Sequence, residues 1–127
     1  MRKILLDMQS GLFAKAIQRT LAQELDNYQI IVSEHPDKTV QHCRIFKPYA
    51  LLMEATAYTP WMLEERLAIR DKVKKNDPDC KIVILVDDRA DSGLAEKVKA
   101  AKRDALIDAF LFESVTEQYM AAVMDSL

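Results

Sequence analysis

The sequence predicts an α/β fold in which one parallel sheet of five strands lies between two layers of helices. Three observations lead to this prediction. Short apolar runs without helical periodicity alternate with longer segments whose apolar residues recur every three to four positions. The apolar runs are dominated by aliphatic residues, as strands buried on both faces require. A repeated strand–helix order places helices on both faces of such a sheet.

Residues 4–8 form the first predicted strand. Ser10 is the expected N-cap of a helix over residues 12–25. A second strand follows at residues 28–33, and then a short helix at residues 36–46 that begins with a proline in its first turn. The helical spacing predicts that the buried stripe of the first helix consists of Leu12, Phe13, Ala16, Ile17, Leu21 and Leu25.

The third strand, residues 49–54, is a short apolar run that ends in a single carboxylate. Thr59 and Pro60 predict the start of a helix over residues 61–75, because they combine a capping side chain with a proline tolerated in the first turn. Residues 81–86 (KIVILV) are the fourth strand. This continuous run of aliphatic residues predicts burial on both faces and a central place in the sheet.

A helix is expected over residues 94–106, followed by the fifth strand at residues 108–112. Residues 114–117 (SVTE) have the pattern of a capping box, so the last helix is expected to begin near Val115. The residues of this helix that are expected to face the sheet are Tyr119, Met120, Val123, Met124 and Leu127.

The composition limits the classes of function. The chain has 127 residues, half of them hydrophobic, which predicts a single domain over residues 1–127. The net charge of -2 offers no general electrostatic attraction for nucleic acid, so direct nucleic-acid binding is not expected. No apolar run approaches the about 18 residues of a membrane span. Cys43 and Cys80 form no CxxC pair and are expected to be buried thiols in a reducing, cytoplasmic compartment.

Four carboxylates are expected at the C-terminal edge of the sheet, where open α/β sheets bind ligands. They are Asp7, Glu54, Asp87 and Glu113. One interpretation is a divalent-cation site, with weak Mg²⁺ binding by Asp7 and Glu54, because clustered carboxylates suit this ion. The other is an acidic crevice without a cofactor, in which mutual repulsion raises pKa values.

The order of the elements, together with two segments, resembles the receiver domain of response regulators. Residues 47–54 (KPYALLME) resemble the family's KPDLVLLD, and residues 108–114 (DAFLFES) are similar to its DDYLTKP. The resemblance covers essentially the whole chain. It implies a flavodoxin-like, doubly wound sheet with strand order 2-1-3-4-5 and a signalling role without enzymatic activity. It also implies either a separate receiver-like domain or the N-terminal module of a longer regulator.

The residues that receivers use for phosphoryl transfer are replaced in this chain. The family accepts the phosphoryl group on an aspartate after the third strand, and Glu54 takes that position. A Thr or Ser after the fourth strand is replaced by Val86, with Asp87 beside it, and the lysine after the fifth strand is replaced by Glu113. Of the acid pair that holds Mg²⁺ after the first strand, only Asp7 remains.

These replacements predict a degenerate pseudo-receiver that is not phosphorylated. Phosphoryl transfer is catalysed by positioning and charge neutralisation, and a phosphorylated side chain would add about -1.5 to -2 charges beside acids. Phe110 fills the aromatic position whose packing reports the state of a receiver. The resemblance implies control of transcription or of another output through a protein partner or a homodimer. The implied interface is the face of the fourth helix, fifth strand and fifth helix, whose charged groups are Lys99, Lys102, Arg103, Asp108, Glu117 and Asp125.

Two alternatives stay open. One is an orthodox receiver that accepts phosphate on another acid, such as Asp7 or Asp87. The other is a small-ligand-binding or enzymatic domain on a flavodoxin-like fold. Against this second alternative, the sequence contains no GxGxxG motif and no P-loop. It also shows no nucleophilic Cys or Ser with a histidine nearby.

Overall fold

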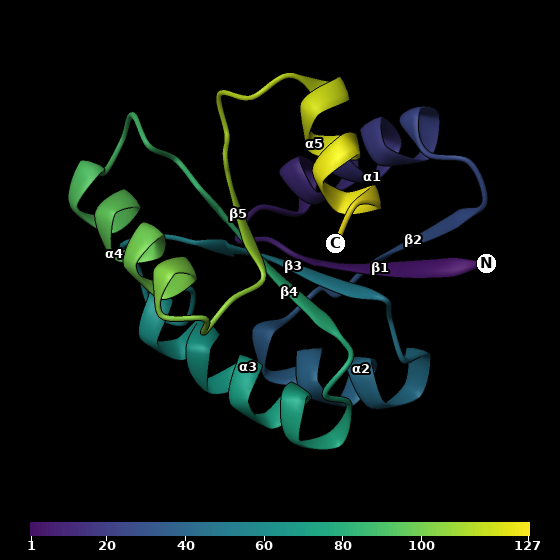
Figure 1. Cartoon of the computed structure of the whole chain (residues 1–127), viewed down its shortest axis with the longest axis horizontal. Coiled ribbons are helices and arrows are strands. Elements are labelled where there is room, and N and C mark those ends of the chain that lie inside the picture. Colours follow the sequence, from purple (N-terminus) through teal and green to yellow (C-terminus); the bar gives the residue numbers. More distant parts are fainter.

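Five parallel strands form the central layer of the computed structural model, which describes residues 1–127 (Figure 1). The strand order is β2-β1-β3-β4-β5, and every neighbouring pair is parallel. The predicted α/β fold class and strand order are therefore confirmed. The strands are β1 (Arg2–Asp7), β2 (Tyr28–Val32), β3 (Ala50–Ala55), β4 (Lys81–Val86) and β5 (Ala109–Phe112).

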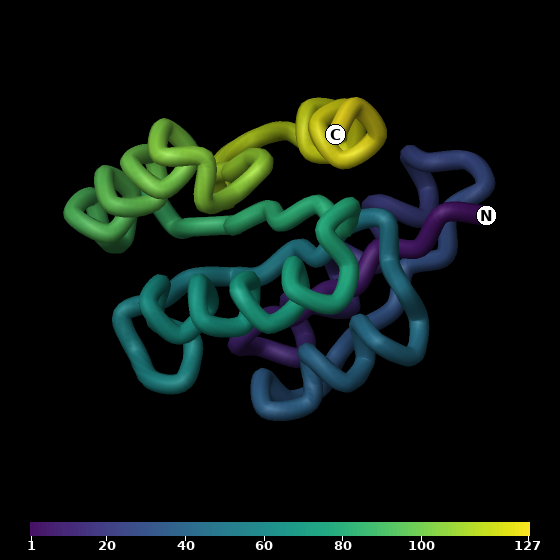
Figure 2. Tube along the Cα trace, turned by 60° about the horizontal axis from the view of Figure 1, so that its bottom comes forward, coloured from purple at the N-terminus to yellow at the C-terminus, as the bar shows by residue number.

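Helices cover both faces of the sheet. One face carries α1 (Gly11–Glu24) and α5 (Glu117–Asp125), which contact each other. The other face carries α2 (Thr39–Phe46), α3 (Leu63–Asn76) and α4 (Ser92–Arg103), with a 3-10 turn at Pro36–Lys38 before α2. Figures 1 and 2 show α4 and α5 apart from one another, with β5 between them at the edge of the sheet. None of the helices is both long and apolar enough to span a lipid bilayer.

Alternation along the strands assigns each side chain to one of these two layers. On β1 and β3, Leu6 and Leu52 belong to the core under α1 and α5, whereas Leu5 and Met53 belong to the core under α2, α3 and α4. Successive side chains of a strand point to opposite faces. Asp7 therefore lies on the face of Leu5, and the side chain at position 54 lies on the face of Leu52.

Several helices begin at residues other than those predicted. The cap of α1 is confirmed, because Ser10 Oγ accepts the N–H of Phe13 at 3.3 Å. Thr59 and Pro60 do not start α3, which begins at Leu63 after a loop. There the Glu65 carboxylate accepts the N–H of Met62 at 3.3 Å.

The last two helices also differ from prediction at their starts. Asp91 caps α4, since its Oδ1 accepts the N–H of Leu94 at 2.9 Å, and α4 therefore begins at Ser92. Thr116 caps α5, since its Oγ1 accepts the N–H of Tyr119 at 3.1 Å. Helix α5 therefore begins two residues later than the capping-box pattern predicted.

Three predicted core residues, Leu12, Ala16 and Tyr119, lie on the surface. The side of α1 that contacts the sheet is centred on Ala14, Ile17 and Leu21. At about 100° per residue, Leu12 falls on the opposite side of that helix, and it is 83% exposed. Tyr119 likewise lies outside the buried side of α5 and is 56% exposed.

Candidate functional site

A cavity of about 280 Å³ opens at the C-terminal edge of the sheet. It lies between the ends of β3 and β4, the loop that precedes α4 and the segment that follows β5. Three of the four predicted acids line it, namely Glu54, Asp87 and Glu113, and Asp91 adds a fourth carboxylate. No Lys, Arg or His side chain lines this cavity. We call it the acidic crevice.

Strand register brings the three predicted acids together. Glu54 is paired in register with Leu85, and Asp87 follows that residue by two positions, on the same face. Glu113 extends the β4–β5 ladder by one hydrogen bond, from its N–H to the carbonyl oxygen of Val86 at 3.0 Å. Because alternate residues share a face, all three carboxylates lie on the side of the sheet that carries Leu85.

Three of the crevice acids accept hydrogen bonds from the backbone. Glu54 Oε1 accepts the N–H of Gln9 at 2.9 Å, which ties β3 to the β1–α1 loop. Asp87 Oδ1 accepts two N–H groups of the following loop at 3.0 and 3.1 Å, and Asp91 caps α4. These donors stabilise the charged carboxylates. The acids therefore organise the loops around the crevice.

Glu113 differs from the other acids in its protonation. Burial raises the pKa of Glu113 to about 7, together with a hydrogen bond and charge repulsion from Glu54 and from Asp87. Three carboxylates cannot all ionise cheaply at short range, so one of them keeps its proton. At neutral pH the Glu113 carboxyl is therefore partly protonated and can donate a hydrogen bond to Glu54.

The fourth predicted acid, Asp7, does not lie in the acidic crevice. It is 0% exposed and points to the opposite face of the sheet, where it meets Arg66 of α3, which is also 0% exposed. Asp7 Oδ2 accepts Arg66 Nη1–H at 2.7 Å and the hydroxyl of Thr39 at 2.6 Å, and Oδ1 accepts Nη2–H at 3.3 Å. The expectation that Asp7 shares a site with Glu54 is therefore wrong, because the two positions have opposite parity on adjacent strands.

Arg66 holds the ends of two neighbouring strands. Its Nη2 also donates to the carbonyl oxygen of Asp7 at 3.0 Å, and its Nε donates to the carbonyl oxygen of Glu54 at 2.7 Å. The polar cluster continues through Thr39 to Ser33 at 3.3 Å, and from Ser33 Oγ to His42 Nδ1 at 2.8 Å. We call these five side chains, Asp7, Arg66, Thr39, Ser33 and His42, the buried polar network.

The sequence prediction did not include Arg66. One signal for it was present, because Arg66 follows Leu63 by three positions and precedes Val73 by seven. Leu63, Arg66 and Val73 form the buried stripe of α3. An arginine on such a stripe requires an acid on the opposing layer, and Asp7 is that acid.

Val86 is also placed differently from the expectation. It is 0% exposed, belongs to the core under α2, α3 and α4, and does not line the acidic crevice. The residue after β4 that faces Glu54 is Asp87. At the end of β4, the side chain on the face of Glu54 is therefore a carboxylate.

The predicted Mg²⁺ ligands do not fit one ion. Asp7 and Glu54 point to opposite faces of the sheet, and the oxygens of Asp7 are bonded to Arg66 and Thr39. No group of three or more His, Cys, Asp or Glu side chains is arranged to hold a metal ion. The acids of the chain therefore do not form the Mg²⁺ site that the sequence suggested at Asp7 and Glu54.

The predicted aromatic position lies on the edge strand. Phe110 of β5 is half-buried and packs against the core under α2, α3 and α4. Its ring centroid lies 5.5 Å from that of Phe112 on the same strand.

Comparisons with known proteins support the fold. No protein-family profile and no curated protein sequence matches this chain. A response regulator receiver domain protein from Clostridium thermocellum has a TM-score of 0.79 and 13% identity, covering 98% of this chain and 92% of that one. A response regulator from Thermotoga maritima has a TM-score of 0.77 and 14% identity, covering 98% of this chain and 95% of that one. A CheY-like protein (tadZ) from Pseudomonas aeruginosa PAO1 has a TM-score of 0.73 and 15% identity, covering 98% of each chain.

The fold is thus that of the CheY-like receiver domains, with a five-stranded parallel sheet in the order 2-1-3-4-5. The sequence is far from the solved structures that share this fold, at 11–15% identity. Fold alone does not determine function, so the function has to be argued from the site.

Proposed function

We propose that this chain is a receiver-like signalling domain that controls protein contacts without phosphoryl transfer. The observation that carries the proposal is the lining of the acidic crevice. This crevice lies where a receiver would hold its phosphoryl group, and it presents four carboxylates and no cationic side chain. The CheY-like fold supports the signalling role.

The electrostatics of the crevice oppose an added phosphoryl group. Such a group would bring about -1.5 to -2 charges next to Glu54, Asp87 and Glu113. Catalysis of phosphoryl transfer depends on neutralising that charge. The pKa of Glu113, raised to about 7 by burial and by its neighbouring carboxylates, supports this argument.

An atypical phospho-acceptor is also disfavoured by the structure. Asp7 is fully buried and paired with Arg66, so it cannot meet a phosphate donor without unfolding. Asp87 is partly exposed, but its Oδ1 holds the N–H groups of Arg89 and Ala90. Modification of Asp87 would release the loop that it organises.

An enzymatic role finds little support in the side chains. A Ser–His pair does exist, contrary to the sequence prediction, because Ser33 Oγ lies 2.8 Å from His42 Nδ1. Ser33 is however only 2% exposed, and neither residue lines the acidic crevice. This pair belongs to the buried polar network.

The face of α4, β5 and α5 is the proposed output surface. β5 is an edge strand, and beside it a groove of about 580 Å³ is lined by Phe110, Phe112 and Tyr119, among others. Half-buried aromatic groups on an edge strand, with the exposed Tyr119 of α5 beside them, suit a protein contact, either with a partner or with a second copy.

The charged groups expected to pair across this face are not all free. Asp108 Oδ2 accepts Lys74 Nζ at 3.2 Å and the N–H of Ile82 at 2.7 Å. Asp125 Oδ1 accepts the hydroxyl of Tyr28 at 2.6 Å. Two of the three expected acids are thus bonded within the chain, and the apolar groove is the stronger candidate for the contact.

Amide NMR of the ¹⁵N-labelled chain tests the loss of phosphoryl transfer. Beryllofluoride mimics the phosphoryl group, and we expect its addition with Mg²⁺ to leave the amides of Glu54, Asp87 and Phe110 unshifted. An orthodox receiver domain, treated identically, serves as the positive control. Shifts at these three residues that need both reagents would refute the proposal.

Sedimentation velocity tests the output surface. If a second copy binds there, the wild-type chain associates with rising concentration, and Tyr119→Glu abolishes that association. Ile45→Glu is the matched control, because Ile45 is 62% exposed on α2, and α2 packs against β1 and α3. A wild-type chain that stays monomeric would direct the search to a different protein partner.

A further inference from the structure

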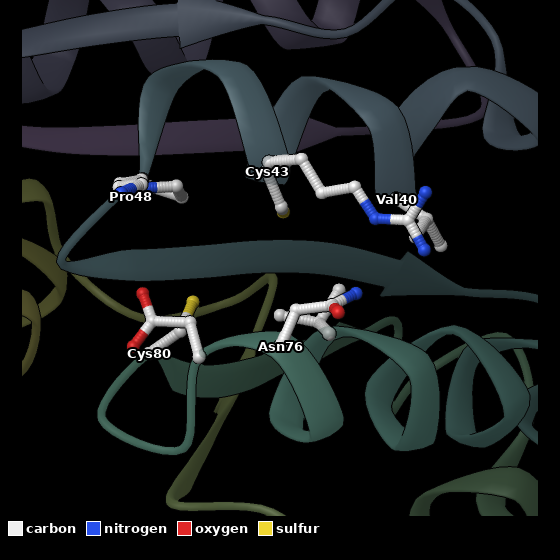
Figure 3. A pocket seen from close by; sticks show the side chains of 9 residues that line it. Val40, Cys43, Pro48, Asn76 and Cys80 are labelled. Atoms are coloured by element: carbon white, nitrogen blue, oxygen red, sulfur yellow. The ribbon is translucent and has the colours of Figure 1, made fainter.

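The two cysteines of the chain face each other at the end of the sheet opposite to the acidic crevice. Cys43 lies in α2, and Cys80 immediately precedes β4. Both are free thiols and buried, as predicted, at 6% and 1% exposure. Figure 3 shows their side chains pointing toward one another, and both residues line the same cavity.

The thiols line a cavity of about 130 Å³ between α2 and α3. Its walls include Val40, Pro48 and Val73, and two exposed cations, Arg44 and Lys47, also line it. A water molecule occupies about 30 Å³ of liquid volume. The cavity therefore has room for a molecule as small as hydrogen peroxide next to both sulfur atoms.

The two thiols have different acid–base roles. A hydrogen bond from Cys43 S–H lowers the pKa of Cys80, with a further contribution from the Lys74 ammonium, against the opposing effect of burial. The same hydrogen bond, together with burial, raises the pKa of Cys43. The thiolate is the reactive form of cysteine. We therefore assign Cys80 as the nucleophile of the pair, and the two variants below test this order.

We propose that Cys43 and Cys80 form a reversible intramolecular disulfide in response to hydroperoxides. The Cys80 thiolate attacks one peroxide oxygen, an S–O bond forms, and the O–O bond breaks. The hydroxide that leaves takes up a proton and becomes water. This step yields a sulfenic acid on Cys80.

The second step closes the disulfide. The Cys43 sulfur attacks the sulfenic sulfur of Cys80, an S–S bond forms, and the S–O bond breaks. The departing hydroxide takes the Cys43 proton and leaves as a second water molecule. In total, the peroxide is reduced by two electrons and the two thiols are oxidised by two electrons.

The disulfide would fix α2 against the start of β4. Cys43 follows Thr39 by one helical turn, and the Thr39 hydroxyl donates to Asp7 in the buried polar network. Oxidation therefore restrains the helix that supports this network. Closing a loop of this length restricts the unfolded chain, and we expect the thermal midpoint to rise by about 5 to 15 °C.

The first experiment uses the wild-type chain alone. The reduced protein is treated with hydrogen peroxide, remaining thiols are alkylated in denaturant, and tryptic peptides are analysed by mass spectrometry. We expect the peptides at residues 39–44 and 76–81 to be joined, both thiols to be lost together, and reductant to restore them. Two free thiols after peroxide treatment, or a disulfide between two chains, would overturn the proposal.

Two variants test the order of the steps. Cys43→Ser is expected to stop at a sulfenic acid on Cys80, which dimedone traps. Cys80→Ser is expected to lose its remaining thiol at least about tenfold more slowly, because Cys43 is protonated. Equal rates in the two variants would overturn the assignment of Cys80 as the nucleophile. Circular dichroism checks that each variant is folded, and the wild-type result stands independently of both.

Discussion

Replacing Arg66 with methionine removes the cation that pairs with Asp7 in the buried polar network while keeping most of the side-chain volume. In the wild-type chain, the Arg66 guanidinium donates to both oxygens of the Asp7 carboxylate and to the carbonyl oxygens of Asp7 and Glu54. After the change, the carboxylate keeps one side-chain donor, the hydroxyl of Thr39. The substitution therefore leaves a fully buried carboxylate without its counter-charge.

The size of the effect follows from the burial of the pair. Removing one partner of a buried ion pair costs about 3 to 5 kcal/mol, and the two carbonyl oxygens each lose a hydrogen bond as well. We expect Arg66→Met to lower the free energy of unfolding by about 4 kcal/mol, out of about 5 to 15 kcal/mol for a domain. Adding Asp7→Leu removes the orphaned charge, and we expect it to restore about 2 kcal/mol or more.

Urea unfolding, followed by circular dichroism at neutral pH, measures these free energies by linear extrapolation. Arg103→Met is the control, because that side chain is 77% exposed and lies 3.8 Å from Asp104. A surface pair of this kind contributes less than about 1 kcal/mol. The reasoning fails if Arg66→Met costs no more than the control, or if the Arg66 and Asp7 losses simply add in the double variant.

Three further predictions concern the network and the crevice. Thr39→Val removes the 2.6 Å hydrogen bond to Asp7 and should cost about 1.5 to 3 kcal/mol in urea unfolding, whereas a cost near zero would contradict the network. Because folding raises the pKa of Glu113 from 4.5 to about 7, its contribution to stability is present below pH 4.5 and is lost as the pH rises to about 7. The free energy of unfolding should therefore fall over that window in the wild type relative to Glu113→Gln, and parallel pH profiles would count against the shift. Millimolar Mg²⁺ should leave the amide NMR signals of Glu54 and Asp87 unchanged; a saturating shift there would indicate a metal site.

The elements of the fold were predictable because their signals are local. The aliphatic run of β4 and the apolar spacing of the helices need no knowledge of the rest of the chain. Helix ends were less predictable where two capping residues compete. Ser114 and Thr116 both have side chains that can cap a helix. The N–H of Glu113 bonds to Val86 and extends the strand ladder past β5, so the helix begins later and Thr116 is its cap.

The acidic crevice was predictable in part, and the errors in that prediction have one cause. Each acid was correctly placed at the C-terminal edge of the sheet, but the face on which it lies depends on strand alternation and register. Asp7 pairs in register with Met53, one position before Glu54, and this single step puts the two carboxylates on opposite faces. The same alternation buries Val86 and presents Asp87.

The spacing from Leu63 and Val73 marks Arg66 as a candidate for the buried stripe of α3, but it marks Arg70 equally. Helix α3 has charged residues on most of its surface, and Arg70, one turn later, is partly exposed and bonded to Asp71. What separates Arg66 from Arg70 is an acid on a strand 59 positions earlier in the sequence. A buried polar pair between distant segments is visible only once the layers are assembled.

The buried pair also constrains how a signal could act on this domain. In this domain the acid that ends β1, Asp7, is neutralised by Arg66, a cation that belongs to the chain itself. A permanent charge such as that of Arg66 cannot provide a reversible signal. A conformational equilibrium shifts only when a ligand or a chemical change interacts differently with its two states. The groups that can change are the Glu113 proton, the exposed groove beside β5 and the Cys43–Cys80 pair. The cysteine pair adjoins the network through α2, which carries both Thr39 and Cys43 on its buried side. If oxidation changes the buried polar network and leaves the groove beside β5 unaffected, the cysteine pair acts separately from that groove.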